Sequence, residues 1–341
     1  MLRLPKRNPN DLMNICQEDC LKPKQTNRAL DYGRCDSHNL AAPLSVAGRT
    51  VMLNAGTFQG TRRAFEDRWS VDVSPDGLAI VVGVYDGHNG AEAAEHLRER
   101  LGRAVLEHGE VLTEPARALR EACRQVDAQL AQDQALHFRK RQAGSTAVLC
   151  LLVPGTLAVA NVGDSRATVI DQKGNVIILT AQHRASKRAE SERLAKLGGT
   201  VEVGSDGMAR AGGQLEVSRA FGHASLKSFI VAEPDIYIKP LAEAQALVLA
   251  SDGLGDLVPN QVIVKTLASS LCTRPAETLA RLAQAKGAAD NVCVLSLRFA
   301  DHNTIDHSGE VSKGLATVQP LVLEGHEEAR AVRDNNTVKV D

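Results

Sequence analysis

The chain has 341 residues, 43% of them hydrophobic, with 40 Lys and Arg against 41 Asp and Glu. This composition supports one large globular core or two smaller ones, and the formal net charge of −1 argues against a global field that recruits nucleic acid or anionic membrane. Apolar runs such as AVLCLLV at 147–153 are far shorter than the roughly 20 residues of a membrane-spanning helix. We therefore expect a soluble protein without nucleic-acid or membrane partners.

Residues 1–48 are polar, contain several turn-forming residues and lack a sustained hydrophobic period, so they are predicted to form an arm. The first basic residues are not followed by an apolar segment, which argues against a secretory signal. We expect a cytoplasmic protein, with the nucleus also compatible and a mitochondrial presequence as a minor alternative.

Seven cysteines in a chain of this length are typical of reduced thiols rather than of a disulfide framework. Four of them lie in apolar or helical segments. The other three form, with a histidine, the spacing C-x3-C-x14-C-x2-H at Cys16, Cys20, Cys35 and His38. This spacing is compatible with a tetrahedral zinc site, and equally with unrelated thiols in a loose arm.

After the arm, short β-branched or alternating runs bounded by turn residues predict a series of strands. They lie at 50–58, 68–73, 79–85, 145–153, 156–162, 166–171, 175–179, 246–251 and 292–299. Apolar residues spaced three and four apart predict helices at 91–107, 114–138, 187–197 and 275–286.

Strands cluster and helices pair along the chain, which favours an α+β fold with mostly antiparallel sheets and helices packed outside. The segment 200–240 is rich in Gly, Pro and charge, and is predicted to form a mobile surface flap near the site rather than a core element. We expect one domain over 49–300, followed by a polar tail over 301–341.

Carboxylates recur at the ends of these predicted strands. Asp86 ends the apolar run IVVGVY at 80–85, where the sequence Asp-Gly alone would indicate a turn. The other acids in this situation are Glu66, Asp67, Asp164, Asp252, Asp256 and Asp290. Several carboxylates at neighbouring strand ends would be costly to bury without counter-charge, and their oxygens suit Mg²⁺ or Mn²⁺.

These motifs resemble those of the metal-dependent serine/threonine protein phosphatases of type 2C. The resemblance covers about residues 50–300 and rests on eight ordered blocks. The blocks are R-x-x-x-E-D at 62–67, VYDGHNG, GSTA, ANVGDSRA, LEVSRAFG, VAEPDI, LASDGLGD and ADN.

The resemblance implies a four-layer α-β-β-α sandwich, two sheets with a helix pair outside each, and a centre of two Mg²⁺ or Mn²⁺ ions bridged by Asp86. One ion would also take Asp252 and Asp290, and the other Glu66 and the Gly87 carbonyl. Asp67 would orient these ligands through hydrogen bonds, and Asp164, together with Asp256, would help to hold a weaker third ion.

The implied reaction is hydrolysis of phosphoserine or phosphothreonine by direct attack of a metal-bridging water, without a phospho-enzyme. Arg62 would bind the substrate phosphate and His88 would protonate the leaving oxygen. The implied partners are phosphoprotein substrates, and we expect a monomer.

Three positions depart from the family pattern. Asn89 replaces a glycine, and Asn is expected to be tolerated there as a helix-capping residue. Gln182, His183 and Arg184 stand where Asp-His-Lys is usual, and His223 stands where an aspartate follows the glycine of SRAFG. We expect the last two departures to weaken a third metal or to reshape the flap.

Two other functions are compatible with parts of the pattern. A pseudophosphatase acting as a binding module would keep the fold, but it would be expected to lack some of the acids that are all present here. A haloacid-dehalogenase-like site with Asp86 as nucleophile requires a second acid two residues later, where His88 stands, and a doubly wound parallel sheet.

Overall fold

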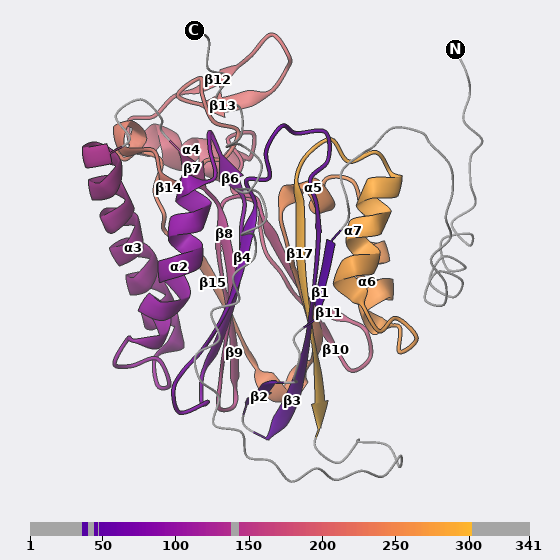
Figure 1. Cartoon of the computed structure of the whole chain (residues 1–341). Coiled ribbons are helices and arrows are strands. Elements are labelled where there is room, and N and C mark those ends of the chain that lie inside the picture. The colour runs from indigo at the N-terminus through magenta and orange to yellow at the C-terminus, as the bar shows by residue number, and fades with distance from the viewer. Residues whose placement is uncertain (1–35, 40–43, 47, 138–142, 302–341) are drawn as a thin grey trace, which may run out of the picture. The chain divides into compact units, whose positions relative to one another are not determined.

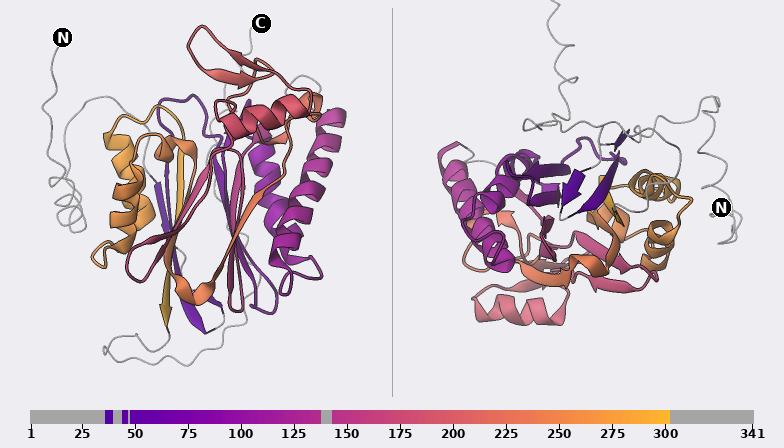
Figure 2. Two further views of the ribbon diagram at one scale, coloured as in Figure 1. Left: turned by 180° about the vertical axis from the view of Figure 1, so that it is seen from behind. Right: turned by 90° about the horizontal axis from the view of Figure 1, so that it is seen from below.

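The computed structural model describes residues 36–39, 44–46, 48–137 and 143–301. Within these residues, two sheets face each other and each carries helices on its outer side (Figure 1). Seen from below, the two helix groups lie on opposite sides of the sheets (Figure 2). The strand ladders of both sheets are antiparallel, so the expected four-layer α-β-β-α sandwich is confirmed.

One sheet has five strands in the described part of the chain. Their order is β15 (Asp235–Pro240), β9 (Thr156–Val162), β8 (Ala147–Val153), β5 (Ile80–Tyr85) and β4 (Arg68–Val73). Its outer face is covered by α2 (Glu92–Leu106) and α3 (Pro115–His137).

The other sheet has seven described strands. Six are ordered β1 (Asp36–Asn39), β3 (Arg49–Phe58), β17 (Val292–Asp301), β16 (Ala244–Ala250), β10 (Arg166–Asp171) and β11 (Val176–Leu179), and β2 (Leu44–Val46) also pairs with β3. Its outer face is covered by α6 (Asn260–Ala268) and α7 (Pro275–Ala285), while α5 (Asp252–Gly255) forms one turn after β16.

Strand β5 shows why these sequences form doubly covered sheets. All six of its residues are buried. Ile80, Val82 and Val84 pack between the two sheets, whereas Val81 and Tyr85 pack under α2 and α3. Because successive side chains of a strand point to opposite faces, a continuous apolar run fills two cores at once.

The segment between β11 and β15 forms a separate small unit, which we call the flap (residues 185–230). It contains α4 (Arg188–Lys196), the hairpin β12 (Val201–Val203) and β13 (Ala209–Ala211), and η1 (Ala224–Leu226), and it has its own buried cluster that includes Leu194 and Ile230. A third small sheet, β14 (Phe221–Gly222), β7 (Gly144–Ser145) and β6 (Gly87–His88), connects the flap to the end of β5.

The prediction that 200–240 contains no core element was wrong at its C-terminal end. Strand β15 pairs with β9 along its whole length and completes the five-stranded sheet. It lies at the sheet edge and its residues are half-buried or exposed, which explains why its lysine and its terminal proline are tolerated.

The predicted arm also contributes structure, because β1 and β2 pair with β3. Cys16, Cys20 and Cys35 lie outside the described residues, as does the side chain of His38, so the zinc hypothesis stays a prediction. The other four cysteines are buried and free, as expected for reduced thiols; they are Cys123, Cys150, Cys272 and Cys293. Within the described residues, no helix combines the length and apolar character required to cross a membrane.

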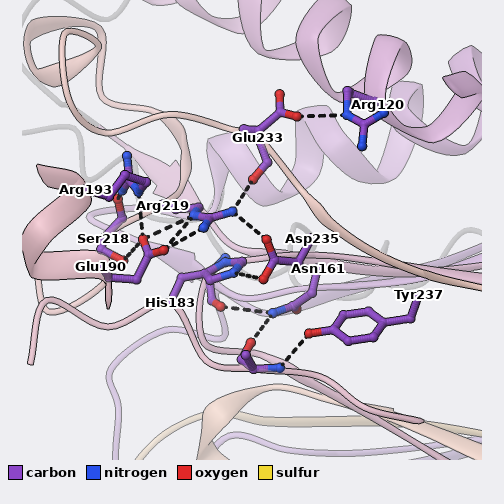
Figure 3. A network of polar contacts seen from close by, with 12 residues as sticks. Arg120, Asn161, His183, Glu190, Arg193, Ser218, Arg219, Glu233, Asp235 and Tyr237 are labelled. Carbon is purple, nitrogen blue, oxygen red and sulfur yellow. Dashed lines mark hydrogen bonds and ion pairs between the residues drawn. The ribbon is translucent and has the colours of Figure 1, made fainter. Parts of the chain in front are cut away.

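A buried polar network attaches the flap to the five-stranded sheet (Figure 3). Arg219 donates to Glu190 of α4 at 2.6 Å and to Asp235 of β15 at 2.9 Å. Glu190 also accepts hydrogen bonds from Arg193 and Ser218. Burial alone would raise the pKa of Glu190, but these donors lower it to about 2.

We expect Glu190→Gln to lower the free energy of unfolding by about 2 kcal/mol at neutral pH, because it removes the charge that three donors bind. Since the folded pKa is depressed, this contribution is present above the unfolded value of 4.5 and is lost as pH falls toward about 2. Denaturant titration at several pH values measures the difference.

The matched control is Glu192→Gln on the same helix, where an exposed glutamate pairs with Arg188. It should change stability by less than about 0.5 kcal/mol. Equal effects of the two substitutions would contradict the role assigned to the network.

Candidate metal centre

The predicted site residues gather at one edge of the two sheets. Asp86 directly follows β5, and Asp164 and Asp252 are the second residues after β9 and β16. Glu66 and Asp67 precede β4, and Asp290 precedes β17. Because the strands are antiparallel, the end of β5 lies beside the start of β4, and the end of β16 beside the start of β17. The fold therefore brings together acids that are far apart in the sequence.

Three of these acids converge within ligand distance. Oxygens of Asp86, Asp164 and Asp252 all lie within 4.8 Å of one another, and this group could hold a metal ion. Burial raises the pKa of Asp86 well above its ordinary value, and Asp67, Asp252, Asp164 and Asp290 add to this by repulsion. The pKa of Asp252 is raised well above its ordinary value for the same two reasons. These oxygens therefore fit divalent cations, which would relieve the repulsion.

Glu66 and Gly87 lie next to each other beside this group. The Glu66 backbone N–H donates to the side chain of Asn291 at 2.7 Å, and Asn291 in turn donates to the carbonyls of Gln59 and Ala64. A Cβ at Gly87 would lie 2.6 Å from the Glu66 carbonyl oxygen, so only glycine allows this approach. Sequence reasoning missed Asn291, although it forms the last residue of the ADN block.

Asp67 is 1% exposed and lies close enough to Asp86 to raise its pKa by repulsion. Its Oδ2 is buried without a hydrogen-bond partner. Burial raises its pKa to about 7, although contact with Ser251 lowers it, and Asp290 raises it further. This oxygen remains able to accept a hydrogen bond from water bound to an ion, which is compatible with the predicted orienting role.

Arg62 lies at the exposed rim of the site. Its Nη2 is 2.6 Å from Oδ2 of Asp290, and the two side chains are 60% and 40% exposed. The predicted phosphate-binding arginine and a predicted metal ligand thus lie in direct contact, with the guanidinium open to solvent.

His88 follows Asp86 by two residues and contacts His223 of the flap. Their Nε2 atoms are 2.6 Å apart and the rings stack with centroids 4.8 Å apart. A Cβ at Gly144 would lie 2.0 Å from His223 and 2.5 Å from His88, so the strand beneath them requires glycine. Sequence analysis singled out His223 but did not predict this contact, because it joins segments 135 residues apart.

The reason given for tolerating Asn89 was wrong. The residue before α2 is Ala91, and Asn89 instead has a left-handed backbone with φ of 60°. Asn adopts this conformation more readily than most residues, which explains why it can replace a glycine there.

Asp164 is buried and pairs with Arg184, whose Nε lies 2.9 Å from its Oδ2. Burial raises the pKa of Asp164, while the guanidinium lowers it. This predicted ligand of a third ion therefore already has a cation from the chain itself.

The fold and the acid-rich edge together define the class of type 2C phosphatases. A solved serine-threonine phosphatase 2C from Toxoplasma gondii superposes with a TM-score of 0.67 at 22% sequence identity, covering 78% of this chain and 99% of that one. A bacterial serine phosphatase superposes with a TM-score of 0.57 at 22% identity, covering 72% of this chain and 96% of that one. At these identities the likeness establishes the fold.

The sequence comparisons establish the family. The family model for protein phosphatase 2C matches residues 52–292. A rice relative, "Probable protein phosphatase 2C member 13, mitochondrial", is 39% identical over 73% of this chain and 68% of its own length. An Arabidopsis thaliana relative, "Probable protein phosphatase 2C 76", is 38% identical over 73% of this chain and 59% of its own length.

The chain belongs to the protein phosphatase 2C family, and the expected enzyme class, a protein phosphatase, is confirmed at the level of this family. The family is metal-dependent, which agrees with the converging carboxylates. The aligned region covers 59% of the Arabidopsis relative and 50% of a further rice relative, "Probable protein phosphatase 2C 52".

We expect Asp86→Asn to stabilise the metal-free protein by more than about 1 kcal/mol at neutral pH and above. A raised folded pKa means that the ionised carboxylate opposes folding, so its removal helps most at high pH and least near the unfolded value of 3.8. Thermal unfolding in EDTA measures the effect, and saturating Mn²⁺ should reverse the order by stabilising the parent more than the variant.

Asp76→Asn is the control for this comparison. Asp76 is exposed, and hydrogen bonds from Ser74 and Leu78 lower its pKa. Its replacement should not stabilise the protein. A metal-free Asp86→Asn variant no more stable than the parent would contradict the repulsion inferred at the site.

Proposed function

We propose that the chain hydrolyses phosphoserine and phosphothreonine in proteins, using two Mg²⁺ or Mn²⁺ ions. The observation that carries this proposal is the close approach of Asp86 and Asp252 at the buried sheet edge, with Asp290 near enough to raise the pKa of both. Such repulsion destabilises the folded protein unless cations bind between the carboxylates and neutralise them.

One ion would be held by Glu66, Asp86 and the Gly87 carbonyl, and the other by Asp86, Asp252 and Asp290. The bridging role of Asp86 is supported by its repulsion from both Asp252 and Asp290, and the Gly87 position by its close approach to Glu66. When bound, the ions supply positive charge against the phosphate and lower the pKa of the water that attacks phosphorus.

Arg62 would bind the phosphate of the substrate. Its guanidinium is exposed at the rim and reaches the site through Asp290, and a planar fork can bind two phosphate oxygens at once.

His88 would donate the proton to the serine or threonine oxygen as it leaves. Burial lowers the pKa of His88 to about 4, so the ring is neutral in the absence of substrate, and a phosphate dianion beside it favours the protonated form. Nε2 of His88 lies 2.6 Å from Nε2 of His223, so this nitrogen would donate to the substrate oxygen once the substrate takes the place of His223.

The alternatives have less support. A pseudophosphatase is not favoured, because Glu66, Asp86, Asp252 and Asp290 are all present at the site. A haloacid-dehalogenase-like enzyme is excluded by the fold, since the described strands of the main sheets form antiparallel ladders and not a doubly wound parallel sheet.

We further propose phosphoprotein substrates, a monomer, and a catalytic domain over residues 49–300 between a polar arm and a polar tail. A cytoplasmic location remains our proposal. The rice relative is named as mitochondrial, which gives the presequence alternative for this chain more weight than its sequence alone does.

We expect hydrolysis of phosphothreonine peptides to stop with EDTA and to return with Mn²⁺ or Mg²⁺, because oxygen ligands alone cannot stabilise attack on a phosphate dianion. Asp252→Asn should lower turnover by several orders of magnitude while the circular dichroism spectrum stays unchanged. Full activity after exhaustive chelation would refute the proposed function.

The leaving group distinguishes an acid from a structural residue at His88. We expect His88→Ala to reduce turnover of a phosphoserine peptide by a factor on the order of 10² to 10⁴ and to affect p-nitrophenyl phosphate much less, since nitrophenolate leaves without a proton. His108→Ala, beyond the opposite end of α2, is the control and should leave both rates unchanged. Equal losses on both substrates would mean that His88 supports metal binding or folding instead of donating the proton.

A further inference from the structure

Arg184 lies among the acids that a third ion would use. Its Nη2 is 2.8 Å from Oδ2 of Asp256 and 3.3 Å from Oδ2 of Asp252, in addition to the 2.9 Å contact between Nε and Asp164. One guanidinium thus contacts three carboxylates. The Arg184, Asp164 and Asp252 side chains are 20%, 5% and 25% exposed, whereas Asp256 is 46% exposed, so the cluster runs from the buried Asp164 to the surface.

The segment that carries Arg184 is fixed on both sides by backbone hydrogen bonds. His183 donates to the carbonyl of Gly163 at 2.9 Å, and Ala185 donates to the carbonyl of Glu216 at 2.8 Å. Arg184 itself forms an isolated antiparallel bridge with Val217. The backbone that carries the guanidinium is therefore held in place on both sides of Arg184.

The two preceding residues bind the same turn that presents Asp164. Gln182 donates to the carbonyl of Asp164 at 3.1 Å, and Nδ1 of His183 accepts from the backbone of Gly163 at 3.1 Å. The three consecutive side chains 182–184 thus all contact the Gly163–Asp164 turn. Gln182, His183 and Arg184 are the residues that depart from the family's Asp-His-Lys. Their contacts with this turn explain how the departure could affect a third metal at Asp164.

We infer that Arg184 is the built-in counter-cation of Asp164 and Asp256, so that this centre holds two divalent ions and no third. The inference rests on the proposed two-ion function, and it replaces the expectation that Asp164 and Asp256 hold a weaker third ion. An arginine keeps its charge at every pH the protein tolerates, and its fork satisfies several carboxylate oxygens at once. A divalent ion at Asp164 would have to displace this cation, whose bonds to the acids would then be lost.

The number of bound ions tests the inference, and isothermal titration calorimetry with Mn²⁺ measures it directly. The parent should bind two ions per chain. Arg184→Met, which keeps much of the side-chain length without the charge, should gain a third, weaker binding event, because Asp164 and Asp256 lose their counter-cation. Arg188→Met is the matched control: Arg188 is 92% exposed and pairs with Glu192, and this variant should bind two.

Asp164→Asn provides a second measurement that does not depend on the stability of the arginine variant. It should still bind two ions, with affinities within a few-fold of the parent. Three ions on the parent, two on folded Arg184→Met, or one on Asp164→Asn would each overturn the inference. Failure of the proposed function is distinct: the parent would bind no ions, or its phosphopeptide hydrolysis would not respond to Mn²⁺.

Discussion

Repulsion among buried carboxylates is the constraint on which the rest of this structure depends. Burial and neighbouring acids raise the pKa of Asp67, Asp86 and Asp252 at a sheet edge where water is largely excluded. Antiparallel strands from two sheets must meet there to bring acids from distant segments together, and the surrounding apolar layers must be stable enough to hold them. The three apolar layers of the sandwich, one between the sheets and one under each helix pair, provide this stability.

The chain relieves this repulsion in two ways. On the β4 and β5 side we propose that cations from solution relieve it. On the β9 and β16 side Arg184, which directly precedes the flap, contacts Asp164, and the flap itself brings His223 to His88. The flap is itself attached to the five-stranded sheet through Arg219, which binds Glu190 of α4 and Asp235 of β15 (Figure 3). Displacement of the flap would therefore also move His223 away from His88.

Most of the layered fold could be predicted from local patterns, because apolar runs such as 80–85 and 147–153 can only be buried on both faces. Strand β15 was missed because an edge strand tolerates the charge and proline that usually indicate a loop. Helix α6 was missed because its short NQVIVKTLA segment does not differ from a strand in local sequence.

The acids of the site could be predicted from their positions at strand ends, but the residues that contact them could not. Arg184 reaches Asp256 across 72 residues and His88 reaches His223 across 135 residues, and no local pattern carries such contacts. Asn291 was overlooked for a different reason: it stands beside a predicted ligand, and its hydrogen bonds to Glu66 and the 59–64 loop appear only in three dimensions.

The position of β17 has a consequence for how the protein is made. This last described strand of the chain lies inside the seven-stranded sheet, between β16 and β3, and pairs with β3 from Val292 opposite Phe58 to Asp301 opposite Arg49. Asp290 and Asn291 directly precede it. During translation the sheet therefore stays open until nearly the whole domain has left the ribosome, and closure of such distant contacts is slow. The same event closes the sheet and brings in Asp290, so an incomplete nascent chain cannot assemble the full set of proposed ligands.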